Sequence, residues 1–68
     1  MSNSGLRGDI DKNFVNMMIP HHQGAIDMAK VELQYGKDPQ LLEMARKIIE
    51  AQDKEIIEMK GWQAAHSQ

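Results

Sequence analysis

Two adjacent histidines, His21 and His22, lie among methionines in the first half of the chain. Imidazole and thioether groups together are the ligand set that a soft metal ion such as Cu(I) selects. Residues three, four and seven apart share one face of a helix. Met17 precedes His21 by four residues. Met18 precedes His22 by the same interval, and Met28 lies seven residues after His21. The spacing therefore predicts that these donors gather on one side of a helix.

The same residues have a second interpretation as ordinary core residues. Methionine commonly fills irregular gaps in apolar cores, and a single histidine on an apolar face is usually packed and hydrogen-bonded there. From the residue types alone, a metal site and a packed core are both open interpretations.

The composition limits the other functions. The chain has 68 residues, a net charge of −2 and no cysteine, so we expect one small domain without disulfides or thiolate ligands. It carries no basic stripe for nucleic acid and no apolar run of the ~18 residues that a membrane span needs. Residues 1–10 lack the pattern of a signal peptide. We expect them to form a flexible segment ahead of a helical hairpin at 11–68.

Hydrophobic periodicity predicts that the first helix runs over about 11–35. Asp9 or Asp11 is the expected N-cap, because a carboxylate there can accept from the free amides of the first turn. Apolar residues and both histidines occupy one broad face of this helix, with polar residues opposite.

A break in the sequence separates this helix from a second one over about 39–63. Gly36 suits the left-handed position that follows many helices. Asp38 suits the N-cap of the second helix and Pro39 its first turn. The short connection predicts an antiparallel hairpin.

Two polar residues, Gln52 and Glu55, interrupt the apolar face of the second helix. A buried polar group without a partner costs about 1–3 kcal/mol. A turn centred near Lys37 places His22 opposite Gln52 and Met18 opposite Glu55 or its neighbour. The two polar residues could satisfy the histidines in a buried hydrogen-bond network, or they could orient the imidazoles for a metal ion. Both interpretations predict the same proximity.

Two helices of this length cannot cover both broad apolar faces by themselves. Each spans ~38 Å at the standard rise per residue. Pairing with a second hairpin gives a four-helix bundle, which buries such faces. We therefore expect an all-α fold, an antiparallel hairpin that dimerises into a ferritin-like four-helix bundle, with a second copy of the chain as partner.

Two spaced patterns carry a family resemblance. The first consists of Asp11, Phe14, Met18, Ile19, Pro20, His21, His22, Ala25, Ile26, Met28 and Ala29. The second consists of Ala45, Ile48, Ile49, Gln52, Glu55, Ile56, Met59 and Trp62. Together they resemble the signature of a bacterial ferritin-like group catalogued as domain of unknown function 305. Many members of that group are similar in carrying two hairpin units, whereas this chain has one, so the other half would come from another subunit.

The resemblance implies a helical bundle of a group that is often exported or periplasmic and has copper-associated members. The implied metal ligands are Met18, His21, His22 and Met28, with Met17 and Met59 as further candidates. Gln52 and Glu55 are the residues expected to support them.

The leading expectation is therefore a non-catalytic protein that binds a copper ion for copper storage, transfer or tolerance. The alternative is a structural or interaction bundle with no metal function. A histidine acting as a general base near Glu55 is a third possibility, but no nucleophile or substrate pocket accompanies it, and we expect no enzymatic activity. Ferroxidase chemistry is not expected either, because neither His21 nor His22 has the glutamate three residues earlier that di-iron bundles use.

Overall fold

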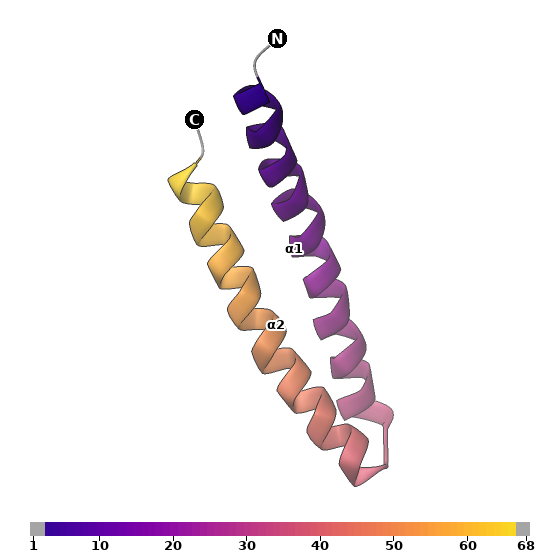
Figure 1. Ribbon diagram of the computed structural model, residues 1–68. Helices are drawn as coiled ribbons and strands as arrows, with labels where there is room; N and C mark the ends of the chain where they lie inside the picture. The colour runs from indigo at the N-terminus through magenta and orange to yellow at the C-terminus, as the bar shows by residue number, and fades with distance from the viewer. Residues whose placement is uncertain (1–2, 67–68) are drawn as a thin grey trace.

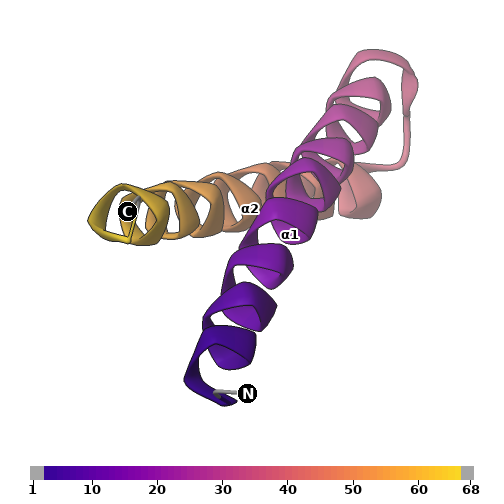
Figure 2. The same ribbon diagram turned by 90° about the horizontal axis from the view of Figure 1, so that it is seen from above.

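Two antiparallel α-helices make up the computed structural model, which describes residues 3–66 of the chain and their side chains from residue 10 onward. Helix α1 (Asn3–Tyr35) and helix α2 (Pro39–Ala65) are joined by a short turn (Figure 1). This confirms the predicted all-α hairpin. The helices cross at an angle, as the view from above shows (Figure 2), and the hairpin is elongated, measuring 55 × 19 × 14 Å. Within the described residues, neither helix combines the length and hydropathy that crossing a membrane requires.

Helix α1 begins at Asn3, so the expected N-cap at Asp9 or Asp11 is wrong because both residues lie inside the helix. The helix includes most of the segment that we placed ahead of the hairpin. The reason is that this segment contains glycines but no proline. A glycine weakens a helix by about 1 kcal/mol relative to alanine without interrupting it, whereas proline costs about 3 kcal/mol.

The turn stops one helix and starts the next. Asp38 caps α2 as expected, because its Oδ1 accepts from the backbone amides of Gln40 at 2.9 Å and Leu41 at 3.2 Å. Gly36 does not adopt the predicted left-handed conformation. A Cβ at Gly36 would instead collide with the backbone carbonyl and the carboxylate of Glu32. The close approach of Glu32 therefore explains why a residue without a side chain occupies this position.

The helices contact each other along one seam. Its buried apolar members are Val15, Ile26, Ala29, Ala45 and Ile56. One polar side chain, His22, is also buried there. Spacings of three, four and seven residues keep these positions on the facing sides of the two helices.

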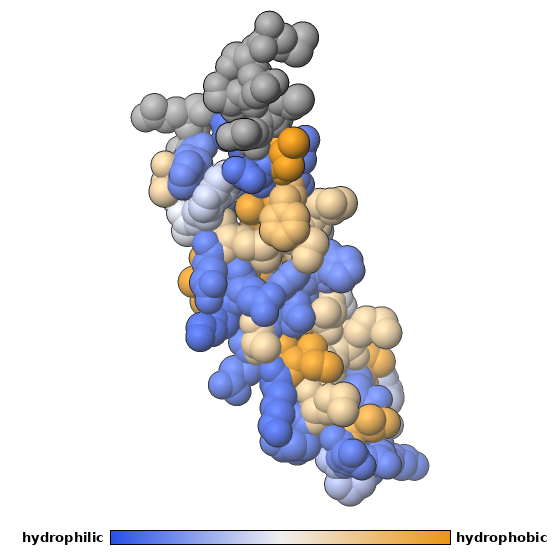
Figure 3. Space-filling model, viewed as in Figure 1, coloured by the Kyte–Doolittle hydropathy of each residue, from blue (hydrophilic) through white to orange (hydrophobic). Residues whose placement is uncertain are grey.

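The broad apolar face of α1 is only partly used by this seam. A second row, which we call the outward stripe, stays exposed on α1. The outward stripe consists of Ile10, Phe14, Met17, His21, Gly24, Met28, Val31 and Tyr35. Figure 3 shows apolar side chains forming a band along the α1 side of the molecule. Helix α2 also exposes apolar side chains, among them Leu41, Met44 and Ile48. The hairpin therefore leaves an apolar face uncovered.

Candidate metal-binding groove

A groove of about 540 Å³ lies between the helices at the end of the hairpin away from the turn. We call it the open-end groove. Its lining residues are Asp11, Phe14, Val15, Met18, His22, Glu55, Glu58, Met59 and Trp62. Besides apolar side chains it includes an imidazole, two thioethers and three carboxylates, which are groups that can serve as metal ligands.

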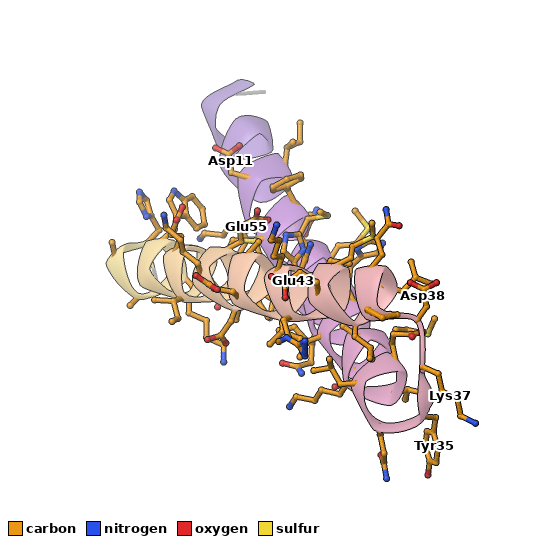
Figure 4. The ribbon with its side chains drawn as sticks, turned by 90° about the horizontal axis from the view of Figure 1, so that it is seen from below. Asp11, Tyr35, Lys37, Asp38, Glu43 and Glu55 are labelled. Atoms are coloured by element: carbon orange, nitrogen blue, oxygen red, sulfur yellow. The ribbon has the colours of Figure 1, made fainter. Side chains whose placement is uncertain are left out.

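His22 is the polar centre of this groove. It occupies a seam position, seven residues after Val15 and seven before Ala29, and is 7% exposed. Its Nε2 lies 2.5 Å from Oε1 of Glu55, and because a carboxylate oxygen accepts, the imidazole N–H donates. Figure 4 shows Glu55 on α2 at the level where the helices cross. The contact therefore joins the two helices and fixes which ring nitrogen carries a proton.

The second ring nitrogen of His22, Nδ1, is buried and makes no hydrogen bond to any residue that the structure describes. A neutral imidazole that donates from Nε2 carries its lone pair on Nδ1. Buried polar atoms nearly always have a partner, so each exception needs a reason. A metal ion is one partner that this lone pair could take.

Two thioethers line the same groove. Met18 comes from α1, four residues before His22, and Met59 comes from α2, four residues after Glu55. Both side chains are half-buried. One nitrogen and two sulfur donors fit a soft ion such as Cu(I) better than a hard ion that prefers oxygen.

Three carboxylates, those of Asp11, Glu55 and Glu58, line the groove as well. Carboxylates that line a cleft favour the approach of cations. Across the described residues, no three His, Cys, Asp or Glu side chains come together as a metal site. The groove therefore lacks the carboxylate-rich centre of a di-iron bundle, and its thioethers distinguish it.

The remaining candidate ligands lie outside this groove. His21 is exposed, and its ring meets that of His22 edge-on with centroids 6.2 Å apart. Met17 is 64% exposed and Met28 is 75% exposed. All three belong to the outward stripe, so the structure brings Met18, His22 and Met59 together and leaves Met17, His21 and Met28 on the surface.

The pairing of the helices differs from the register expected for a turn centred at Lys37. His22 contacts Glu55, which lies one helical turn beyond Gln52. The side-chain amide of Gln63 donates to Oδ1 of Asn16 at 2.8 Å, and this pair is displaced from the expected register in the same direction. The helices cross, and a glutamate side chain is long enough to span a turn, so a count from the middle of the loop misplaces the contacts. Gln52 is half-buried but does not line the groove.

A second groove of about 360 Å³ lies nearer the turn, and we call it the turn-end groove. It is lined by Ala25, Met28, Ala29, Glu32, Leu41, Met44, Ala45 and Ile48. Outward-stripe residues line both grooves, Phe14 in the first and Met28 in the second, so both open on the apolar face.

Several groove residues were not identified from the sequence as part of a site. Asp11, Glu58 and Trp62 are among them. Spacing could have identified the last two, because Glu58 and Trp62 follow Glu55 by three and seven residues and so share its side of α2. His66 is exposed and caps α2: its backbone amide donates to the Trp62 carbonyl at 3.1 Å, and its ring stacks on that of Trp62 with centroids 4.2 Å apart.

Comparison with known proteins identifies a family without assigning an activity. The sequence model of the family described as Domain of unknown function (DUF305) matches residues 4–68. The chain is also similar to Uncharacterized protein L153 of Acanthamoeba polyphaga mimivirus, with 47% identity over 51 residues. That match covers 75% of this chain and 34% of the viral protein, so the chain spans about a third of its relative. No solved structure matches the chain.

Proposed function

The chain belongs to the family described as Domain of unknown function (DUF305), and from its open-end groove we propose that it binds a soft metal ion, copper as Cu(I). The protein is proposed to be non-catalytic and to serve copper storage, transfer or tolerance. The observation that carries the proposal is the buried Nδ1 of His22, which has no partner among the described residues, in a side chain that lines a groove together with two thioethers.

The proposed ligands are Nδ1 of His22 and the sulfurs of Met18 and Met59. Glu55 accepts a hydrogen bond from Nε2–H of His22 and so keeps the lone pair on the nitrogen that would bind the metal. Histidines that bind metals commonly donate their other ring N–H to a carboxylate, which orients the ring and makes it more basic. The hairpin provides that arrangement within a single chain.

The direct test is an anaerobic Cu(I) titration against a colorimetric chelator. Wild-type protein is expected to compete for about one Cu(I) per chain, and His22→Ala is expected to lose that competition. His21→Ala is the matched control, since it removes a neighbouring but exposed imidazole and should retain binding. Loss in both variants would add His21 to the ligands, while a wild-type protein that does not compete would contradict the proposal.

We also propose that two hairpins pair through their apolar faces to form a four-helix bundle. The chain exposes 5539 Å², whereas a folded monomer of 7.7 kDa is expected to expose roughly 4,300 Å². The excess of roughly 1,200 Å² is more than the ~800 Å² per partner that a standard interface buries. A second copy supplies an apolar face of matching length, and sedimentation equilibrium at micromolar concentration should detect the dimer.

A structural role without metal is the second candidate. The observation that favours it is the hydrogen bond between His22 and Glu55, which already gives each side chain a partner across the seam. In that case the pair would only hold the two helices in register. Metal affinity separates the candidates, because a structural pair predicts no competition for Cu(I) in any variant.

A further inference from the structure

The open-end and turn-end grooves lie on one face of the hairpin, at opposite ends of its helices. On α1, Phe14 lines the first groove and Met28, two heptads later, lines the second. On α2, Met44 and Trp62 line opposite grooves and are separated by about five whole turns. Positions separated by whole heptads or whole turns share a side of a helix. The hairpin therefore presents both grooves to the same partner.

The turn-end groove is a hollow with a floor of short side chains. Ala29 and Ala45, one from each helix, are 6% and 3% exposed at its base. Larger apolar side chains surround them, and two of these, Met28 and Met44, are 75% and 49% exposed. A hollow of about 360 Å³ with an apolar rim has room for one large side chain. Its shape suits an apolar side chain that comes from outside the hairpin.

The open end carries an aromatic side chain that suits this hollow. Phe14 lines the open-end groove but is 54% exposed, and Trp62 lies half-buried across the groove on α2. Aromatic residues carry large apolar surfaces and are the usual anchors at the core of protein interfaces. The face therefore has an exposed aromatic ring at one end and an apolar hollow at the other.

We propose that Phe14 packs in the turn-end groove of a second copy, while the partner's Phe14 packs in the turn-end groove of the first. This specifies the dimer proposed above and rests on it. A two-fold axis between the grooves produces both contacts at once, because residue i then meets residue j of the partner and j meets i. The same arrangement covers Leu41 and Ile48, which are exposed at the rim of the turn-end groove.

Charge favours this antiparallel arrangement over a parallel one. Asp11, Glu55 and Glu58 line the open-end groove, whereas Glu32 is the only acidic residue among the described residues that line the turn-end groove. A parallel pair would set three carboxylates against the same three of the partner, and like charges juxtaposed across an interface are costly. The antiparallel pair places each acidic end near a turn that carries the exposed, positively charged Lys37 (Figure 4).

Truncation of the aromatic ring is the first test. Phe14→Ala should raise the dimer dissociation constant by about 100-fold, because a buried aromatic anchor is a typical hot spot and the two-fold axis removes two of them. Tyr35→Ala is the matched control, since Tyr35 is also an exposed aromatic residue of α1 but lines neither groove. Its dissociation constant in sedimentation equilibrium should equal that of the wild type. Circular dichroism of each variant checks that the helices still form.

A mixing experiment tests whether Phe14 reaches the turn-end groove of the partner. Phe14→Ala removes the ring and Ile48→Asp spoils the groove, so each homodimer loses both contacts. The heterodimer keeps one complete contact and collects both defects in the other. Because defects at two residues in contact are not additive, the heterodimer should be about tenfold tighter than either homodimer. The mixture should then have a higher weight-average mass than either protein alone, and a mixture without that gain would overturn the contact.

The single tryptophan of the chain reports which face is covered. Trp62 lines the open-end groove, so its fluorescence emission should move to shorter wavelength as the protein concentration rises through the dissociation constant. A dimer that forms through the outer side of α1 would leave this emission unchanged and would contradict the inference.

The outcomes separate this inference from the proposals on which it rests. A wild-type dimer that Phe14→Ala does not weaken would overturn the contact and leave the dimer itself in place. A monomeric wild-type protein would overturn both. None of these results depends on copper, because every experiment uses the metal-free protein.

Discussion

The open-end and turn-end grooves lie on the same face of the hairpin and are built on the same helical repeat, yet of the two only the open-end groove is lined by an imidazole. His22 in the open-end groove lies one heptad before Ala29 in the turn-end groove. Glu55 lies one heptad after Ile48 on the opposing helix. An imidazole and a carboxylate thus occupy positions that are apolar one heptad away.

This difference indicates that the candidate site is a local change of residue type within one repeating pattern of helix packing. The turn-end groove also contains thioethers, those of Met28 and Met44, so methionine alone does not distinguish a site from a packing surface. What distinguishes the open-end groove is a buried imidazole whose proton is held by a carboxylate from the other helix. The predictions below separate the two roles.

The largest expected effect concerns assembly through the turn-end groove. Ile48→Asp should raise the dimer dissociation constant by roughly 100-fold or more, about 3 kcal/mol, because it places an unpaired charge in an apolar interface. Ile57→Asp is the control, since Ile57 is 65% exposed and lies on the other side of the α2 seam residue Ile56. Analytical ultracentrifugation of both variants would contradict the account if they dissociated equally.

The next effect concerns the thioethers of the open-end groove. The double substitution Met18→Leu and Met59→Leu should lower Cu(I) affinity by at least the 10–100-fold seen when residues supporting a metal site are lost. Leucine conserves volume, so folding should be nearly unchanged. Met44→Leu in the turn-end groove should keep wild-type affinity in the same chelator competition. An equal loss of Cu(I) affinity in the double variant and in Met44→Leu would contradict the distinction between the two grooves.

A smaller effect is expected at the carboxylate that holds His22. Glu55→Gln should weaken Cu(I) binding by ~10–100-fold and change the stability of the metal-free protein by about 1 kcal/mol or less, because an amide oxygen can still accept from Nε2. Chelator competition and thermal melting of the same sample compare the two quantities. A large drop in melting temperature with unchanged affinity would favour the structural role.

The smallest effect lies outside both grooves. Asp38→Ala should cost about 1 kcal/mol by removing the N-cap of α2, which lowers the melting temperature by roughly 4–8 °C for a domain of this size. Asp53→Ala, in the exposed middle of α2, should be neutral or slightly stabilising. Copper affinity should be the same in both variants, and a loss in Asp38→Ala would mean that the site depends on the turn.

The hairpin could be predicted from the sequence because its signals are local. Apolar spacing defined the helices, and Asp38 with Pro39 marked the start of α2. The beginning of α1 could not be predicted, because no single residue near Asp11 forces a helix to start there. The conformation of Gly36 was also missed, because the sequence does not show how close Glu32 comes.

The candidate site was only partly predictable for a different reason. Spacing identified the methionines and histidines but could not tell the seam from the outward stripe, since both rows lie within one broad apolar face. The crossing of the helices decides that His22 is buried while His21 is exposed. It also decides that Glu55 rather than Gln52 reaches the imidazole, and a crossing angle is not encoded in a spacing pattern.

The central claim is that a soft metal ion binds Nδ1 of His22 while Glu55 holds Nε2–H. Nitrogen-15 NMR of the imidazoles, recorded with and without anaerobic Cu(I), tests it directly, because the chain has three histidines to assign. The account predicts that Cu(I) shifts the Nδ1 resonance of His22 strongly and leaves its Nε2 protonated. A shift at Nε2 of His22 with loss of that proton, or shifts confined to His21 and His66, would contradict it.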